Sequence, residues 1–93
     1  MKWPLKLYRV NGSSMLPTYQ PGDVLITWSW FRPRVGQVVI SSHERNLVKR
    51  IREISGRAVW LEGDNRAAST DSRQFGPVDV KQISSRVVAR VKA

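Results

Sequence analysis

The chain turns at Gly12-Ser13-Ser14-Met15-Leu16-Pro17-Thr18, residues 12–18, between two segments whose composition predicts strands. Glycine and proline interrupt helices and central strands alike, so this stretch is expected on an exposed turn. A serine hydroxyl between small residues on such a turn is accessible, as a nucleophile must be. A surface loop without chemistry can have the same composition, so the assignment depends on the rest of the chain.

Short strands separated by turns are predicted on both sides of this stretch. Alternating or β-branched residues indicate strands over residues 5–10, 24–28, 38–41, 47–52 and 58–62 and within 83–91, with a turn over 43–46. This spacing is typical of an all-β domain, either a small β-sandwich or a partly open barrel, with little helix. We therefore expect residues 1–93 to form a single domain with a modest core.

The composition limits the chemistry that the chain can perform. Sixteen Lys and Arg against seven Asp and Glu give a net charge of +9, which favours an acidic partner such as nucleic acid, an anionic membrane or an acidic substrate. Cysteine is absent and His43 is the single histidine, so we expect no metal site, thiol nucleophile or other cofactor. No window approaches the roughly 18 apolar residues of a membrane span, and residues 1–10 lack a signal-peptide core, so a soluble or peripheral protein is expected.

Lys49 stands on an apolar strand face. Strand alternation places Leu47, Lys49 and Ile51 on one side, where burial lowers the pKa of a lysine and favours its neutral form. A neutral amine close to the Ser14 hydroxyl can act as a general base without histidine or aspartate. On alternation alone, a lysine whose ammonium reaches the surface past an apolar stem is the favoured interpretation, and the neighbouring motifs reverse that preference.

The polar stretch over residues 63–73 contains Ser69, Asp71 and Arg73 at alternate positions. In an extended segment all three side chains project from one side. Asp71 and Arg73 then suit a structural ion pair, and the Ser69 hydroxyl can hydrogen-bond the lysine amine and orient it. A solvated turn with a surface ion pair is the alternative.

Three aromatic residues, Trp28, Trp30 and Phe31, run into Arg32-Pro33-Arg34. Indole rings beside basic residues favour a lipid interface, so this segment is a candidate peripheral membrane contact. Alternatively, Trp28 and Trp30 pack on the core and Phe31 has no separate role.

Taken together, these stretches resemble the three sequence boxes of the type I signal peptidase family of serine/lysine proteases. Residues 12–18 with Gly22-Asp23 look like its nucleophile box, and Leu47-Val48-Lys49-Arg50 like its lysine box. Gly63-Asp64-Asn65-Arg66, Ser69, Asp71-Ser72-Arg73 and Phe75-Gly76-Pro77-Val78 look like its third box. The boxes follow the family's order, and the resemblance implies a signal-peptidase-like or LexA-like β fold.

The resemblance also implies catalytic roles. Ser14 would be the nucleophile and Lys49 the general base, while Ser69 would orient the lysine and Asp71 and Arg73 would brace their strand. The Ser14 backbone N–H would donate to the oxyanion. Some members add a hydroxyl two positions before the nucleophile, where this chain has Gly12, so a second donor in the Gly12 region is not identified.

Substrate would bind as an extended peptide along two segments, Arg9, Val10 and Asn11 on one side and Leu47 and Val48 on the other. In the family, the residues before the cut are small, typically alanine. The precursor protein is thus the expected partner.

The chain departs from the usual family members, which have an N-terminal membrane anchor and a large β insertion before the third box. Here no anchor is expected, and only 14 positions separate Lys49 from Gly63. Short members of this kind include the maturation proteases of nickel-type superoxide dismutase, which remove an N-terminal propeptide. The preferred expectation is therefore a cytoplasmic serine endopeptidase that processes such a precursor.

Four other interpretations stay open. An anchorless signal peptidase I could cleave exported preproteins at the membrane, as a peripheral protein. A self-cleaving repressor of the LexA type shares the Ser/Lys dyad but lacks the third box. The chain could also be an inactive partner of another protease, or a basic nucleic-acid-binding β module with tryptophan stacking platforms. No recognised nucleic-acid motif supports the last, so nucleic acid is not an expected partner.

Overall fold

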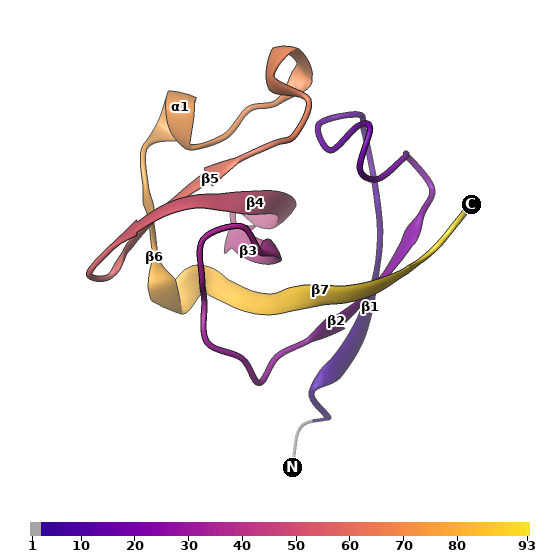
Figure 1. Cartoon of the computed structure of the whole chain (residues 1–93), viewed down its shortest axis with the longest axis horizontal. Coiled ribbons are helices and arrows are strands. Elements are labelled where there is room, and N and C mark those ends of the chain that lie inside the picture. The colour runs from indigo at the N-terminus through magenta and orange to yellow at the C-terminus, as the bar shows by residue number, and fades with distance from the viewer. Residues whose placement is uncertain (1–2) are drawn as a thin grey trace.

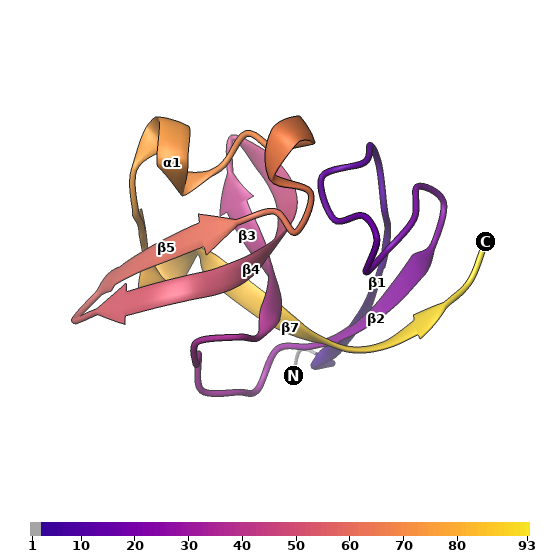
Figure 2. The ribbon, with the colours of Figure 1, turned by 45° about the horizontal axis from the view of Figure 1, so that its top comes forward.

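A computed structural model of the chain describes residues 3–93 as one curled antiparallel sheet that forms a half-barrel (Figures 1 and 2). The strands are β1 (Leu5–Arg9), β2 (Val24–Trp28), β3 (Val38–His43), β4 (Arg45–Ser55), β5 (Ala58–Glu62), β6 (Val78–Asp79) and β7 (Ile83–Val91). Their order across the sheet is β1-β2-β7-β3-β4-β5-β6. The all-β prediction is confirmed, and of its two forms the partly open barrel is the one observed.

The observed strand bounds agree with the predicted ones for some strands and differ for others. β2 and β5 have the predicted bounds, whereas β3 and β4 extend toward each other. The turn predicted over residues 43–46 is wrong in length, because only Glu44, with a φ of 61°, separates these two strands. The β3–β4 ladder therefore continues almost to the tip of the hairpin.

Three short helices and β6 were not predicted. The helices are η1 (Arg66–Ala68), α1 (Ser72–Phe75) and η2 (Val80–Gln82). α1 begins at a capping box in which the Asp71 side chain accepts from the Arg73 N–H and the Gln74 side chain accepts from the Asp71 N–H. η2 has the same arrangement with Asp79 and Gln82.

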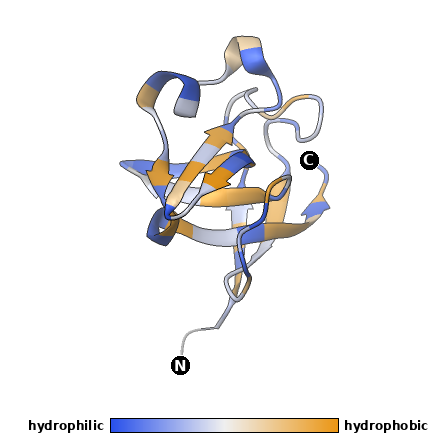
Figure 3. Cartoon of the chain, turned by 60° about the vertical axis from the view of Figure 1, so that its left-hand side comes forward, coloured by the Kyte–Doolittle hydropathy of each residue, from blue (hydrophilic) through white to orange (hydrophobic). Residues whose placement is uncertain are grey.

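The core lies inside the curl of the sheet, and Figure 3 shows hydrophobic segments concentrated along the strands. One buried cluster joins β3, β4, β5, β6 and β7 through Val39, Ile51, Val59, Leu61, Val78 and Ile83. Met15, Leu25 and Ile40 are also buried. Burying side chains of this size contributes about 1.5–3 kcal/mol each, which is the main stabilisation of so small a domain.

The topology places the two predicted catalytic residues on different parts of the sheet. Ser14 lies in the loop between β1 and β2, and Lys49 lies on β4, with β7 and β3 between them in the sheet. The loop of Ser14 and the segment with η1 and α1 rise from the same side of the sheet (Figure 2). Within residues 3–93, no helix has the length and apolar character needed to span a membrane.

Candidate active site

The loop that presents Ser14 is anchored by its neighbour Met15. The Met15 side chain is buried, whereas Ser14 is only partly buried. Within the loop, the Tyr19 N–H donates to the Met15 carbonyl at 2.9 Å and the Leu16 N–H to the Ser13 carbonyl at 3.2 Å. The loop therefore has a fixed shape in which a core residue holds the serine at the surface.

Lys49 is the buried cation of the predicted strand face. Its side chain is 4% exposed, and Ile51 on the same face is 1% exposed, which confirms the predicted alternation there. The ammonium Nζ donates to the Ser69 Oγ at 2.9 Å. Burial lowers the pKa of Lys49, and this effect outweighs the opposing charge of Asp71.

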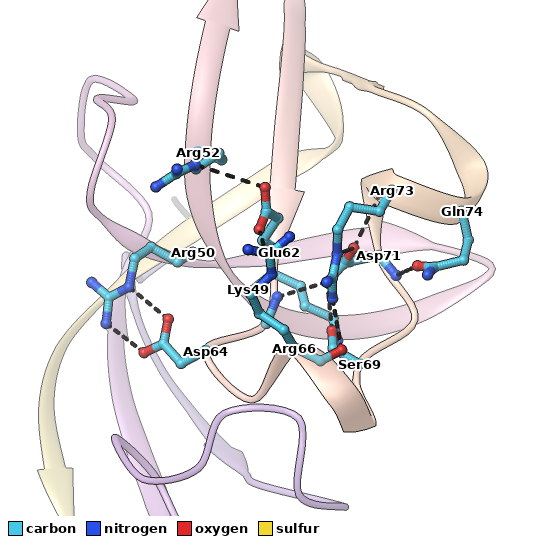
Figure 4. A network of polar contacts seen from close by, with 11 residues as sticks. Lys49, Arg50, Arg52, Glu62, Asp64, Arg66, Ser69, Asp71, Arg73 and Gln74 are labelled. Carbon is cyan, nitrogen blue, oxygen red and sulfur yellow. Dashed lines mark hydrogen bonds and ion pairs between the residues drawn. The ribbon is translucent and has the colours of Figure 1, made fainter.

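Asp71 is the centre of a hydrogen-bond network behind the lysine (Figure 4). Its buried carboxylate accepts from the Ser69 Oγ at 2.6 Å, from the Gly63 N–H at 2.8 Å and from the Arg73 Nε at 3.0 Å. Burial alone raises the pKa of Asp71, but the hydrogen bonds from Arg73, Ser69 and two backbone N–H groups lower it well below 3.8. Asp71 is therefore ionised at neutral pH and fixes the Ser69 hydroxyl on which Lys49 rests.

The extended geometry predicted for Ser69, Asp71 and Arg73 holds at Ser69 and Asp71 but is wrong at Arg73. Asp71 caps α1 and Arg73 lies in its first turn, because the capping box favours a helix over a strand at this point. The predicted Asp71–Arg73 ion pair is nevertheless present, and so is the predicted hydrogen bond between Ser69 and the lysine amine. Thus Arg73 braces the carboxylate from a helix.

Residues 63–73, here called the third segment, also hold the Ser14 loop, and the sequence did not predict this contact. The Asn65 N–H donates to the Ser14 carbonyl at 2.8 Å, and the Asn65 Nδ2 to the Ser13 carbonyl at 3.0 Å. Asp64 accepts from the Thr18 hydroxyl and binds Arg50 through both carboxylate oxygens, at 2.8 and 2.7 Å. The sequence signal for these contacts is the Gly63-Asp64-Asn65 motif, which contains both residues that bind the loop.

Gly63 lies where the two halves of the site meet. A Cβ at this position would stand 2.6 Å from the Ser14 carbonyl oxygen and 2.6 Å from the Ser69 Cβ. Both distances are far shorter than a side chain tolerates. The absence of a side chain at Gly63 therefore allows its backbone to pack against both the Ser14 loop and Ser69, the residue that holds Lys49.

Ser14 and Lys49 line one cleft with a volume of about 330 Å³. All five residues predicted to bind substrate line it as well: Arg9, Val10, Asn11, Leu47 and Val48. Ser69, Asp71 and Arg73 stand outside this lining, behind the lysine. The structure thus brings the predicted site residues together from the end of β1, the loop between β1 and β2, β4 and residues 63–73.

The backbone next to the nucleophile can accept a negatively charged ligand atom. Within residues 3–93, no hydrogen bond uses the Ser14 N–H, so it is available to the oxygen of a tetrahedral intermediate. Gly12 lines the same cleft and has a φ of 74°, a conformation that glycine adopts readily. No cluster of acidic or histidine side chains in the described part of the chain could hold a metal ion there.

The aromatic segment lies at a second cleft, on other elements. Its lining is Trp28, Trp30, Phe31, Arg32, Arg34, Gln37, Arg86 and Val88. The expectation that Trp28 and Trp30 pack together on the core is wrong for Trp30, which is 61% exposed and makes an edge-to-face contact with Trp28. Phe31 is instead the residue that packs against the core cluster, so the aromatics divide between surface and interior.

Comparison with known proteins identifies related sequences. A family model described as Peptidase S24-like matches residues 3–90. Mitochondrial inner membrane protease subunit 1 of Xenopus tropicalis is 38% identical over 80 residues, which cover 75% of this chain and 48% of that protein. The mitochondrial ATP-independent inner membrane protease subunit 1a of Arabidopsis thaliana is 32% identical over 113 residues, covering 88% and 67%.

Subunit 2 of the mitochondrial inner membrane protease of Mus musculus is 30% identical over 102 residues, covering 77% of this chain and 58% of that protein. The chain thus spans about half to two thirds of the length of these relatives.

Proposed function

This chain belongs to the Peptidase S24-like family, and from that premise we propose that it is a serine endopeptidase of the signal peptidase type that removes N-terminal segments from precursor proteins. One observation supports the proposal above the others. Ser14 and Lys49 line the same cleft, and the lysine is buried and held by Ser69. A desolvated amine and an accessible serine that line one cleft are the pair that acyl transfer without histidine requires.

In the proposed reaction, Lys49 Nζ takes the proton of the Ser14 hydroxyl as the Oγ attacks the scissile carbonyl carbon. The Ser14 N–H then donates to the oxyanion, and one such donor contributes about 2.7–4 kcal/mol. Collapse of the tetrahedral intermediate breaks the C–N bond, and the Lys49 ammonium returns its proton to the leaving amine. Water, deprotonated by the same lysine, hydrolyses the acyl-enzyme ester and regenerates Ser14.

Two precursor classes are proposed as substrates. The first is the precursor of nickel-type superoxide dismutase, processed in the cytoplasm. The short sequence separation of Lys49 and Gly63, 14 positions, favours this substrate. The second is an exported preprotein cleaved at a membrane, which the names of the mitochondrial relatives favour. In both cases the substrate lies extended between the residues around Val10 and Leu47.

Membrane attachment in the second case is proposed for the exposed part of the aromatic segment. Trp30 stands beside Arg32 and Arg34 on the second cleft, and Arg86 in its lining has a buried Nε without a hydrogen-bond partner in residues 3–93. Indole and guanidinium groups together suit an interface with anionic lipid. Trp30→Ala is expected to weaken sedimentation with phosphatidylglycerol vesicles and to leave turnover of a soluble peptide unchanged.

The decisive test is a competition between the two precursors in one reaction, with products identified by mass spectrometry. Removal of the dismutase propeptide alone would support a soluble maturation protease, and cleavage of the exported precursor alone would support the membrane assignment. Ser14→Ala is expected to abolish both, while its matched control Ser13→Ala retains most of the activity. Turnover by Ser14→Ala would refute the proposed nucleophile.

A further inference from the structure

The charged side chains that line the substrate cleft all have the same sign. Arg9 comes from the end of β1, Arg45 and Lys49 come from β4, and no Asp or Glu of the described chain lines the cleft. Lys49 is committed to Ser69 and is buried. The two arginines are exposed, so their charges are available to whatever enters the cleft.

Neither cleft arginine has a carboxylate partner within residues 3–93. The ion pairs of this part of the chain engage other arginines, namely Arg50, Arg52, Arg57, Arg66, Arg73 and Arg90. An unpaired guanidinium in a cleft without acidic neighbours can bind an incoming carboxylate through two parallel hydrogen bonds. The cleft therefore offers a site for an acidic group separate from the catalytic pair.

The strand geometry fixes how far this site lies from the reacting bond. Arg45 and Lys49 are four positions apart on β4, whose ladder with β3 is regular between them, so both side chains project to the same face. Four positions of a strand span about 13 Å. An extended substrate along β4 has nearly the same rise, so the residue beside Arg45 is about four residues from the scissile bond.

The electrostatics of Lys49 are consistent with this placement. Burial is the main cause of its lowered pKa, and the positive charge of Arg45 adds to the effect. Arg52, on the same strand beyond Lys49, is not among the charges that shift it and does not line the cleft. Arg52 is thus an exposed arginine of the same strand that lies outside the cleft, paired with Glu62 at 3.8 Å, and it serves as a control for overall charge.

We propose that Arg45, with Arg9 in the same cleft, selects substrates that have an aspartate or glutamate about four residues from the scissile bond. This inference rests on the proposed peptidase function. It adds a charge preference to the small residues expected beside the cut. An exposed ion pair is modest in strength, and the corresponding gain in kcat/KM is about two- to fivefold.

The test uses a series of fluorogenic peptides with alanine one and three positions before the cut. Glutamate, glutamine or lysine is placed in turn at the third to fifth position on either side. For the wild type, glutamate is expected to exceed glutamine at one of these positions, with lysine poorest, and the preference should shrink in high salt. Arg45→Glu should reverse the order at that position, whereas Arg52→Glu should keep it.

Two results would overturn the inference. One is equal kcat/KM for the glutamate, glutamine and lysine peptides at every position. The other is an identical change of preference in Arg45→Glu and Arg52→Glu, which would assign the effect to overall charge. Failure of the peptidase proposal itself is distinguished by the glutamine peptides, which the wild type must cleave and Ser14→Ala must not.

Discussion

Asp64 and Asp71 lie in the same segment and both bind an arginine, yet they support opposite halves of the candidate site. Asp64 binds Arg50 and the Thr18 hydroxyl in the loop of Ser14, the proposed nucleophile, and its side chain is 18% exposed. Asp71 is fully buried and supports Lys49, the proposed base, through Ser69. A partly exposed pair thus suffices to position a backbone loop, whereas a desolvated lysine requires a buried carboxylate, whose hydrogen bonds are stronger in a low dielectric.

Lys49, the proposed base, is supported by Asp71, and its replacement has the largest expected effect on activity. Lys49→Met should lower kcat by about 10²–10⁴-fold, since general base catalysis is worth that much. Lys49→Arg should be equally inactive, because a guanidinium is not deprotonated in a protein. Both are measured as single-turnover rates with the peptide substrate. Substantial turnover by Lys49→Arg would rule out Lys49 as the base.

The same Lys49→Met variant should be more stable than the wild type. The folded-state pKa of Lys49 is lowered, so the protonated lysine destabilises the native state at neutral pH, and an apolar side chain removes that penalty. We expect the free energy of unfolding to rise by about 1 kcal/mol in urea titrations. A decrease would mean that the hydrogen bond to Ser69 outweighs the desolvation of the ammonium.

Neutralising each carboxylate compares the two pairs directly. Asp71→Asn should lower the free energy of unfolding by about 3 kcal/mol, the typical loss when a buried ion pair is broken, and Asp64→Asn by about 1 kcal/mol. The Asp71 contribution is complete above pH 3.8 and is lost as the pH falls toward its lowered folded-state pKa. Equal losses at pH 7 would contradict the distinction based on burial.

Gly63→Ala should disturb both halves together. Its Cβ would collide with the Ser14 carbonyl and with Ser69, so we expect a destabilisation of about 1–3 kcal/mol together with a loss of activity. The matched control is Gly56→Ala, whose Cβ meets no atom within 4 Å but whose φ is 58°. The control should lose stability through backbone strain and keep full activity, so parallel losses of activity would contradict the proposed contact.

The smallest expected effect is a shift in the pH dependence. The proposed mechanism requires neutral Lys49, so kcat/KM should rise with pH along a limb set by the lowered pKa of this lysine. Asp71 raises that pKa, so Asp71→Asn should move the limb to lower pH. Asp64 is not among the charges that shift Lys49, and Asp64→Asn should leave the limb in place. A shift in both variants would show that the two carboxylates are not separable.

The strands that the sequence predicted best are those whose pattern is local. β-Branched and aromatic residues identified β2 and β5 to the residue, and alternation placed Lys49 on the apolar face that proves to be buried. Period-2 alternation needs no knowledge of the strand's partner, because one buried face is enough to produce it. The Asp71–Arg73 ion pair was predictable because the two residues are close neighbours in the chain, whereas the Lys49–Ser69 hydrogen bond spans 20 positions and was predicted from the sequence motifs that contain the two residues.

The contacts that the sequence analysis missed join residues far apart in the chain. Thr18 and Asp64 are 46 positions apart, and Ser13 and Asn65 are 52 apart. No periodicity indicates such pairings, because they depend on how the curl of the sheet brings two loops together. α1 was missed although its signal is local, because that signal is a single capping box over four residues within a stretch that otherwise favours turns.

The place of β7 in the sheet affects when a newly synthesised chain can become active. β7 lies between β2 and β3 but follows every other strand in the sequence, so the hairpin with Ser14 and the strands with Lys49 emerge from the ribosome before the strand that joins them. Non-local pairing of this kind forms late. We expect the nascent chain to contain both Ser14 and Lys49 before their cleft is assembled, so the proposed peptidase would lack a working site until its own synthesis is complete.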